Sequence, residues 1–272
     1  MANKSAKSQK PTANSQKDFS PPRRINYQKG LITVLKIDVM AVGAHPDDVE
    51  VGTGGLLATF VKQGLKVGVV DLTAGEMASN GTAEERHEEA RRAAEVLGLT
   101  WRNCLGIPDR GIAAEKKYLL QLVEVIRQSR PRLILCPYGE DRHPDHVNAS
   151  RLVQEAHFDA GLAKVDCRLP PFRAEQIWYY FLARAAEPTF IVDVSDCYRT
   201  KRLAMTAHAS QFGKDLNRIE TFLNAGPGNM LSVIESRDRY FGSLIGKMYG
   251  EGFITPAPLA IHNPLGLLGV KE

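Results

Sequence analysis

The feature that most constrains the fold of this chain is an alternation of short apolar segments with longer amphipathic ones, beginning near residue 34. Segments rich in Val, Ile and Leu are predicted strands at residues 34–42, 66–72 and 133–137, and residues 101–105 are a further predicted strand. The segments that follow them have helical spacing and are predicted helices at residues 52–63, 83–97, 115–130 and 147–160. Apolar strands that alternate with helices form parallel sheets covered on both faces. The sequence therefore predicts a Rossmann-like α/β fold with a mainly parallel sheet and helices on both faces.

This alternation changes after residue 170, where a C-terminal strand and helix elaboration is expected. The predicted elements are strands at 176–182 and 189–194, a helix at 195–211, a glycine-rich loop at 224–229 and a final helix at 230–249. Residues 256–272 are rich in Pro and Gly and are expected to wrap the surface. Because no linker or internal repeat interrupts the chain, we interpret residues 31–272 as a single domain.

The first 30 residues differ in composition from the rest of the chain. They are rich in Ser, Lys, Gln, Asn and Pro, and we predict that they form a disordered, solvated tail. This tail holds seven of the 35 basic residues and one of the 31 acidic residues, so it accounts for the net charge of +4. The remainder is close to neutral, with 28 basic and 30 acidic residues, which argues against a nucleic-acid partner.

Composition also bears on where the protein works. Hydrophobic residues make up 43% of the chain, and no apolar run approaches the roughly 20 residues that a membrane helix needs. The basic N-terminus lacks the apolar stretch of a secretory signal. The four cysteines form no CxxC pair and are typical of free, buried thiols in a reducing compartment. We therefore expect a cytoplasmic protein without a membrane partner.

Two clusters of His and Asp each follow a predicted strand. The run Ala-His-Pro-Asp-Asp occupies residues 44–48, and the run Asp-Arg-His-Pro-Asp-His occupies residues 141–146. In an open parallel sheet, ligands bind outside the carboxyl ends of the strands, where the strand order reverses. The two clusters can therefore meet at one edge of the sheet, although about 100 residues separate them.

The residue types in these clusters suit a hydrolytic metal site, which uses three protein ligands and leaves a position for water. The candidate ligands are His45, Asp48 and His146. Asp47, next to a proposed ligand but directed elsewhere, would be free to take a proton from the attacking water. In the second cluster, Asp145 near His143 could fix the tautomer of that histidine, which suits an acid or an oxyanion stabiliser.

Further motifs along the chain carry a family resemblance. They are Gly52-Thr53-Gly54-Gly55, Asp71-Leu72-Thr73, Ser79-Asn80-Gly81-Thr82, Arg86, Pro108-Asp109-Arg110-Gly111, Ser210-Gln211-Phe212 and Tyr249-Gly250-Glu251-Gly252-Phe253. Together with the two His/Asp runs, they resemble the PIG-L/LmbE-like zinc-dependent N-deacetylases over about residues 35–270. The resemblance is closest to the branch of bacillithiol biosynthesis, whose enzyme removes acetate from N-acetylglucosaminyl malate.

The resemblance implies roles for the clustered residues. Zn²⁺ would be bound by His45, Asp48 and His146, although sites of this composition accept several divalent ions. Asp47 would be the general base. His143, backed by Asp145, would stabilise the tetrahedral intermediate or protonate the leaving amine.

The resemblance also implies how the substrate and partner chains are bound. Arg86 and Arg142 match positions that line the polar cleft of the family, and Arg110 lies in a similar loop. A guanidinium group can hold a carboxylate of malate, or departing acetate, through two hydrogen bonds. Arg173 could steady a carboxylate of the site. A homo-oligomer, either a trimer or a hexamer, is expected by the same resemblance.

One departure leaves a role unassigned. Some relatives have a tyrosine near the start of the last long helix that helps to hold the oxyanion, but residues 228–231 here read Gly-Asn-Met-Leu. His208 also stands where close relatives tend to have an aromatic hydroxyl. We assign no oxyanion partner, and we expect His208 and His262 to be structural.

Other functions stay open at this point. The substrate could be a different N-acetylglucosaminide, such as an inositol conjugate or a chitobiose-like sugar. A dinucleotide-binding oxidoreductase is disfavoured because residues 52–55 do not match the G-x-G-x-x-G spacing. A sugar-binding protein without catalysis is disfavoured because structural zinc sites usually have four protein ligands, whereas this chain offers three and a spare carboxylate.

Overall fold

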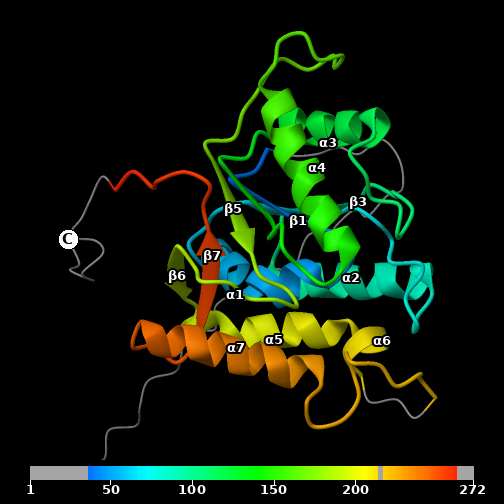
Figure 1. Ribbon diagram of the computed structural model, residues 1–272, viewed down its shortest axis with the longest axis vertical. Coiled ribbons are helices and arrows are strands. Elements are labelled where there is room, and N and C mark those ends of the chain that lie inside the picture. The colour runs from blue at the N-terminus through cyan, green and yellow to red at the C-terminus, as the bar shows by residue number, and fades with distance from the viewer. Residues whose placement is uncertain (1–35, 214–216, 262–272) are drawn as a thin grey trace, which may run out of the picture.

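Seven strands form one sheet in the order β3-β2-β1-β4-β5-β7-β6. The computed structural model describes residues 36–213 and 217–261, drawn as the coloured ribbon in Figure 1. The strands are β1 (Val39–Gly43), β2 (Val67–Asp71), β3 (Trp101–Cys104), β4 (Leu133–Pro137), β5 (Gln176–Tyr180), β6 (Phe190–Asp193) and β7 (Gly250–Ile254). The first five pair in parallel, whereas β7 runs antiparallel between β5 and β6. The predicted mainly parallel α/β sheet is confirmed.

Helices cover both faces of this sheet. They are α1 (Asp48–Lys62), α2 (Ala83–Leu97), α3 (Lys116–Ser129), α4 (Pro144–Ala160), the 3-10 turn η1 (Ser195–Cys197), α5 (Tyr198–Ala207), α6 (Ala209–Phe212) and α7 (Met230–Leu244). In Figure 1, α3 and α4 lie on one face, and α1, α2 and α5 lie on the other. Both faces need cover because successive side chains of a strand point to opposite faces of the sheet, and in β1 they are apolar on both faces. Met40 and Val42 of this strand pack into one core cluster, and Val39 and Ala41 pack into the other.

Local signals place the helix ends near the site. Helix α2 begins after Thr82, whose side chain accepts a hydrogen bond from the Glu85 backbone N–H, and it ends at Gly98 with a left-handed φ of 73°. Pro144 occupies the first turn of α4, where a missing N–H costs nothing, and it keeps His143 extended at φ −89° and ψ 118°. The second His/Asp run is therefore divided between a loop and a helix start.

Two predicted helices have different bounds in the structure. The helix expected from residue 52 begins at Asp48, because Asp47 takes a left-handed φ of 129° and turns the chain directly into α1. The helix expected over 195–211 is divided into η1, α5 and α6. The break lies at His208, whose φ of −81° and ψ of 62° depart from helical values.

The C-terminal part contains a strand that the sequence analysis did not predict. The final helix ends at Leu244 rather than residue 249, and the chain turns back through Gly246, which has a φ of 68°. Residues Gly250–Ile254 then form β7. Its two glycines and one glutamate are poor strand formers, so pairing on both edges and burial of Phe253 outweigh the local preference.

The glycines that follow the first His/Asp run let α1 approach the sheet. A Cβ atom on Gly52 would lie 2.1 Å from Cδ2 of Tyr180, and one on Gly55 would lie 2.7 Å from Cβ of Val194. Both glycines lie inside α1 and not in the turn after β1. They therefore do not form the phosphate-binding turn of a dinucleotide fold, which argues against the oxidoreductase interpretation.

Some expectations concern other parts of the chain. The tail at residues 1–30 and His262 lie outside the described residues. Residues 256–261 are mostly exposed and form no helix or strand, while the rest of the predicted surface segment also lies outside. Among the helices in the described ranges, none is long and apolar enough to cross a membrane.

Candidate metal and active site

The two His/Asp runs meet at one edge of the sheet. Strand β1 ends at Gly43 and is followed by His45, and β4 ends at Pro137 and leads to His143 at the start of α4. These strands are neighbours, and the strand order reverses between them. The rings of His45 and His143 are 4.9 Å apart between centroids. The site therefore lies at the switch point of a doubly wound sheet, as the sequence predicts.

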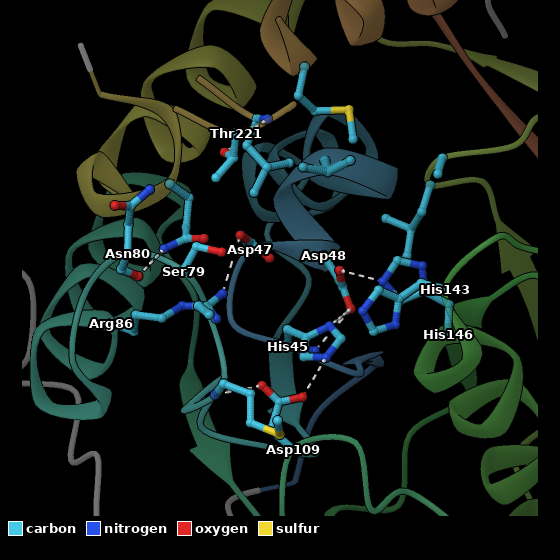
Figure 2. A pocket seen from close by; sticks show the side chains of 18 of the residues that line it. His45, Asp47, Asp48, Ser79, Asn80, Arg86, Asp109, His143, His146 and Thr221 are labelled. Atoms are coloured by element: carbon cyan, nitrogen blue, oxygen red, sulfur yellow. Dashed lines mark hydrogen bonds and ion pairs between the residues drawn. The ribbon is translucent and has the colours of Figure 1, made fainter. Parts of the chain in front are cut away.

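The turn between β1 and α1 directs two neighbouring carboxylates to different sides. Asp47 has a φ of 129°, a conformation that a non-glycine residue adopts only at an energetic cost. Figure 2 shows the result: Asp47 points toward Arg86, whereas Asp48 points toward His146. The strained turn thus separates the proposed base from the proposed ligand.

The three predicted metal ligands lie close together. His45 Nδ1 is 3.6 Å from Asp48 Oδ2, and His146 Nε2 is 3.4 Å from Asp48 Oδ1. Two ligands bound tetrahedrally to zinc at about 2.0–2.1 Å lie about 3.3 Å from each other. The two separations from Asp48 are close to this value, although the histidines face different oxygens of its carboxylate, and two imidazoles with one carboxylate form a donor set that zinc accepts. Two groups of described residues have ligand atoms that all lie within 4.8 Å of one another: His45, His143 and His146, and separately His45, Asp109 and Asp145.

In each of the two proposed ligand histidines, the ring nitrogen that faces away from Asp48 lies near a second carboxylate. His45 Nε2 lies 3.2 Å from Asp109 Oδ1, and His146 Nδ1 lies 3.0 Å from Asp141 Oδ1. A carboxylate accepts the ring N–H at that nitrogen and leaves the lone pair of the other nitrogen for a metal. Both aspartates lie within motifs of the sequence, but no role was predicted for either. Their position near the ends of β3 and β4 was the signal that could have identified them.

The charges at this centre favour a cation. Burial alone would lower the pKa of His45, but hydrogen bonds to Asp109, Asp145 and Asp48 outweigh it and raise the pKa well above the usual value. Burial would raise the pKa of Asp48, but the neighbouring His146 and its hydrogen bond hold it well below the usual range. For Asp47, burial raises the pKa, and the guanidinium of Arg86 opposes the rise.

Asp145 occupies a different place from the one expected. Its carboxylate does not contact the His143 ring; Oδ2 lies 3.5 Å from His45 Nε2, and Oδ1 lies 3.2 Å from the Arg110 guanidinium. The support for His143 comes from the backbone, because the Asp145 N–H donates to His143 Nδ1 over 3.2 Å. This bond is the helix N-cap of α4, and it leaves Nε2 of His143 to carry the ring proton.

The three predicted substrate arginines differ in how much of the guanidinium is accessible. Arg86 is 3% exposed and is bonded to the carbonyl oxygens of Gly75 and Pro46 and to Asp47, so it has no fork open to a substrate carboxylate. Arg142 is exposed and lies 4.4 Å above the ring of Phe222. Arg110 is 46% exposed in its side chain while it contacts Asp145. Arg86 lines the cavity, but its guanidinium is bonded to the protein, and its substrate-binding role stays a prediction.

His208 and Arg173 lie away from this chemistry. His208 is fully buried, with Nε2 3.4 Å from Glu50 Oε2, as expected of a structural residue. Arg173 bonds the carbonyl oxygen of Phe158 at the end of α4 and does not line the cavity.

A cavity of about 450 Å³ opens over the His/Asp cluster. One part of its wall is apolar, with Val51, Leu182, Phe212, Leu223 and Met230. The other part is polar and includes Ser79, Asn80, Gln211, Thr221, Arg110 and Arg142. No tyrosine lines it within the described ranges, in agreement with the missing tyrosine noted in the sequence. The cavity is large enough for a sugar-sized ligand with one apolar and one polar side.

Comparison with known proteins agrees with this arrangement. The family described as PIG-L, GlcNAc-PI de-N-acetylase, matches residues 40–157. The diacetylchitobiose deacetylase of Thermococcus kodakarensis is 29% identical over 240 residues, which cover 82% of this chain and 85% of that protein.

Two solved structures share the fold. A conserved protein of Thermus thermophilus is 38% identical with a TM-score of 0.75, covering 83% of this chain and 97% of that one. The N,N'-diacetylchitobiose deacetylase of Pyrococcus horikoshii, solved with its inhibitor MPG, is 25% identical with a TM-score of 0.71, covering 80% and 83%.

The sheet and its His/Asp centre define a hydrolytic enzyme of Rossmann-like fold. The chain belongs to the PIG-L family of N-deacetylases.

Proposed function

We propose that this chain uses zinc to hydrolyse the acetamide of an N-acetylglucosaminyl conjugate, releasing acetate and a free amine. The observation that carries the proposal is the placement of Asp47 and Asp48 on opposite sides of one helix start. Asp48 lies 3.6 Å from His45 and 3.4 Å from His146, whereas Asp47 lines the same cavity and faces Arg86. A ligand set and a separate base are the two components that metal-assisted hydrolysis requires.

Each residue of the site has a separate role in the proposed hydrolysis. A zinc ion at the three ligands would polarise the acetyl carbonyl and activate a water molecule. Asp47 takes a proton from the attacking water, and Arg86 holds the Asp47 carboxylate in place. The water oxygen bonds to the acetyl carbon, and the C–N bond breaks. His143, whose Nε2 carries the ring proton, donates a hydrogen bond to the oxyanion or a proton to the departing amine.

We infer that the preferred substrate is N-acetylglucosaminyl L-malate, the substrate of bacillithiol biosynthesis. Malate carries two carboxylates, and two arginines with accessible guanidinium groups, Arg110 and Arg142, line the cavity. Arg86 does not support this inference, because its guanidinium is bonded to the protein. Relatives named for diacetylchitobiose make a neutral disaccharide the second candidate.

Acetate release from a substrate panel tests the proposal. The panel contains N-acetylglucosaminyl malate, N-acetylglucosaminyl inositol and diacetylchitobiose, each with and without a chelator. We expect chelator-sensitive acetate release, fastest from the malate conjugate. Equal rates on all three would remove the malate assignment but keep the deacetylase, and release that resists chelation would contradict the metal-dependent mechanism.

The homo-oligomeric state and the cytoplasmic location stay predictions of the sequence. Sedimentation velocity of the full chain would decide between a monomer, a trimer and a hexamer.

A further inference from the structure

We propose that Asp109 and Asp141 are positioning residues that orient the two ligand histidines and tie the rim of the cavity to the metal centre. The inference rests on the metal site of the proposed function. It goes beyond that function because neither aspartate is a candidate ligand, base or substrate contact in it.

Asp109 links His45 to the loop between β2 and α2. Its side chain is 6% exposed, and Oδ1 lies 3.2 Å from His45 Nε2. The other carboxylate oxygen accepts the Met77 backbone N–H over 3.1 Å, and the Asp109 N–H donates to Glu76 Oε1 over 2.8 Å. Met77 lines the cavity. The position of this loop is therefore linked to the ring of His45 through the side chain of Asp109.

Asp141 makes the equivalent link on the other side. Oδ1 lies 3.0 Å from His146 Nδ1 and accepts the His143 N–H over 2.8 Å. Oδ2 accepts the N–H groups of Ala183 and Arg184 over 3.0 and 3.3 Å. Ala183 lines the cavity just after β5. Asp141 thus holds His146, the start of α4 and a second part of the rim together.

The two contacts have the same chemical consequence. Each carboxylate accepts the proton of the outer ring nitrogen and turns the lone pair of the inner nitrogen toward Asp48. Negative charge behind the ring also makes the inner nitrogen a stronger donor, and such partners typically change metal affinity by about 10- to 100-fold.

The alternative role for Asp109 is that of a metal ligand. His45, Asp109 and Asp145 offer ligand atoms close enough to hold a cation themselves. The backbone N–H groups of Met77 and Arg110 already occupy one oxygen of each carboxylate, which favours an orienting role over a ligand role. A ligand role would give a second bound zinc ion that is lost on substitution of Asp109.

Zinc affinity of the full chain, stripped of metal and titrated against a chromophoric chelator, tests the proposal. The variants are Asp109→Asn, Asp109→Ala and Asp141→Asn, and the matched control is Asp196→Asn, whose side chain is exposed and distant. We expect one zinc per chain throughout. Affinity should fall about 10- to 100-fold in the site variants, more for Ala than for Asn at residue 109, and stay unchanged in the control.

Two further readouts separate positioning from a general loss of structure. Thermal unfolding of the metal-free variants identifies any that fail to fold. If Asp109→Ala does not fold, the result for Asp109→Asn is used to judge the role of Asp109. The visible absorption of bound Co²⁺ should shift in the site variants, because the geometry of the ligand histidines changes. Parent-like zinc affinity and Co²⁺ spectra in folded variants would overturn the proposal, as would two zinc ions in the parent with one lost in Asp109→Asn. Tight zinc binding without any deacetylation would instead contradict the proposed function alone.

Discussion

The guanidinium of Arg86 donates a hydrogen bond to the carboxylate of Asp47, with Nη2 3.3 Å from Oδ2. The same nitrogen lies 2.8 Å from the Pro46 carbonyl oxygen, and the other terminal nitrogen lies 2.9 Å from that of Gly75. These bonds brace the turn in which Asp47 has its left-handed φ. We therefore expect Arg86 to hold the proposed base rather than to contact the aglycone of the substrate.

This relationship predicts the effect of Arg86→Lys. Lysine keeps the charge but offers one nitrogen in place of the two that bond Gly75, Pro46 and Asp47, so the Asp47 carboxylate should shift from its working position. A shift of about 1 Å in a catalytic group can cost about 100-fold in rate. We expect kcat/KM to fall about 100-fold on both N-acetylglucosaminyl malate and diacetylchitobiose, with zinc content unchanged. Arg239→Lys, exposed on α7, is the control. A loss confined to the malate substrate would show that Arg86 binds the aglycone after all.

Arg142→Ala tests the substrate assignment. A charge-assisted bidentate pair contributes about 1.5–3 kcal/mol, so its loss should lower kcat/KM for the malate conjugate roughly 10- to 150-fold. A neutral N-acetylglucosaminide should lose far less. Steady-state kinetics on both substrates measure the ratio.

The contact of Arg142 with Phe222 needs its own control, because the substitution also removes that packing. Phe222→Leu removes the aromatic ring but leaves the guanidinium. If Phe222→Leu reproduced the malate-selective loss, the aromatic ring and not the charge would determine the preference.

The close approach of α1 to the sheet predicts a stability effect. In Gly52→Ala the new methyl would collide with the Tyr180 ring at 2.1 Å, and overpacking of this kind typically costs about 1–3 kcal/mol. In Gly139→Ala the nearest atom is Ser150 Oγ at 3.5 Å, an ordinary contact. Urea denaturation should give a lower free energy of unfolding for the first variant and a nearly unchanged one for the second. Equal midpoints would mean that α1 is not held against Tyr180.

The parallel part of the fold could be predicted because its signal is local. A strand such as β1 is apolar at every position since both of its faces are buried, and that pattern is visible without any knowledge of its neighbours. Strand β7 carries no such pattern, because its pairing partners and the burial of Phe253 come from distant parts of the chain. Long-range pairing is what the sequence analysis could not supply.

The same division applies to the site. The proximity of His45, Asp48 and His146 was predictable because His and Asp residues cluster after two strands that a parallel sheet brings to one edge. The contacts that further carboxylates make with the two histidine rings could not be predicted. Asp109 lies 64 residues from His45 and reaches it only through the folded loops. Asp145 was expected at His143 because it is near in sequence, but its position in α4 directs it to His45 and Arg110.

The most direct test of the account compares Asp47→Asn with Asp48→Asn, two adjacent and nearly isosteric changes, by elemental analysis of bound zinc and by turnover. Asp47→Asn should keep one zinc ion per chain, because Asp47 is not a ligand, while turnover falls about 100-fold or more for want of a base. Asp48→Asn should lose the metal and the activity together, because it removes the only carboxylate of a three-ligand set. Retention of zinc by Asp48→Asn, or its loss from Asp47→Asn, would contradict the assignment of ligand and base to these two residues.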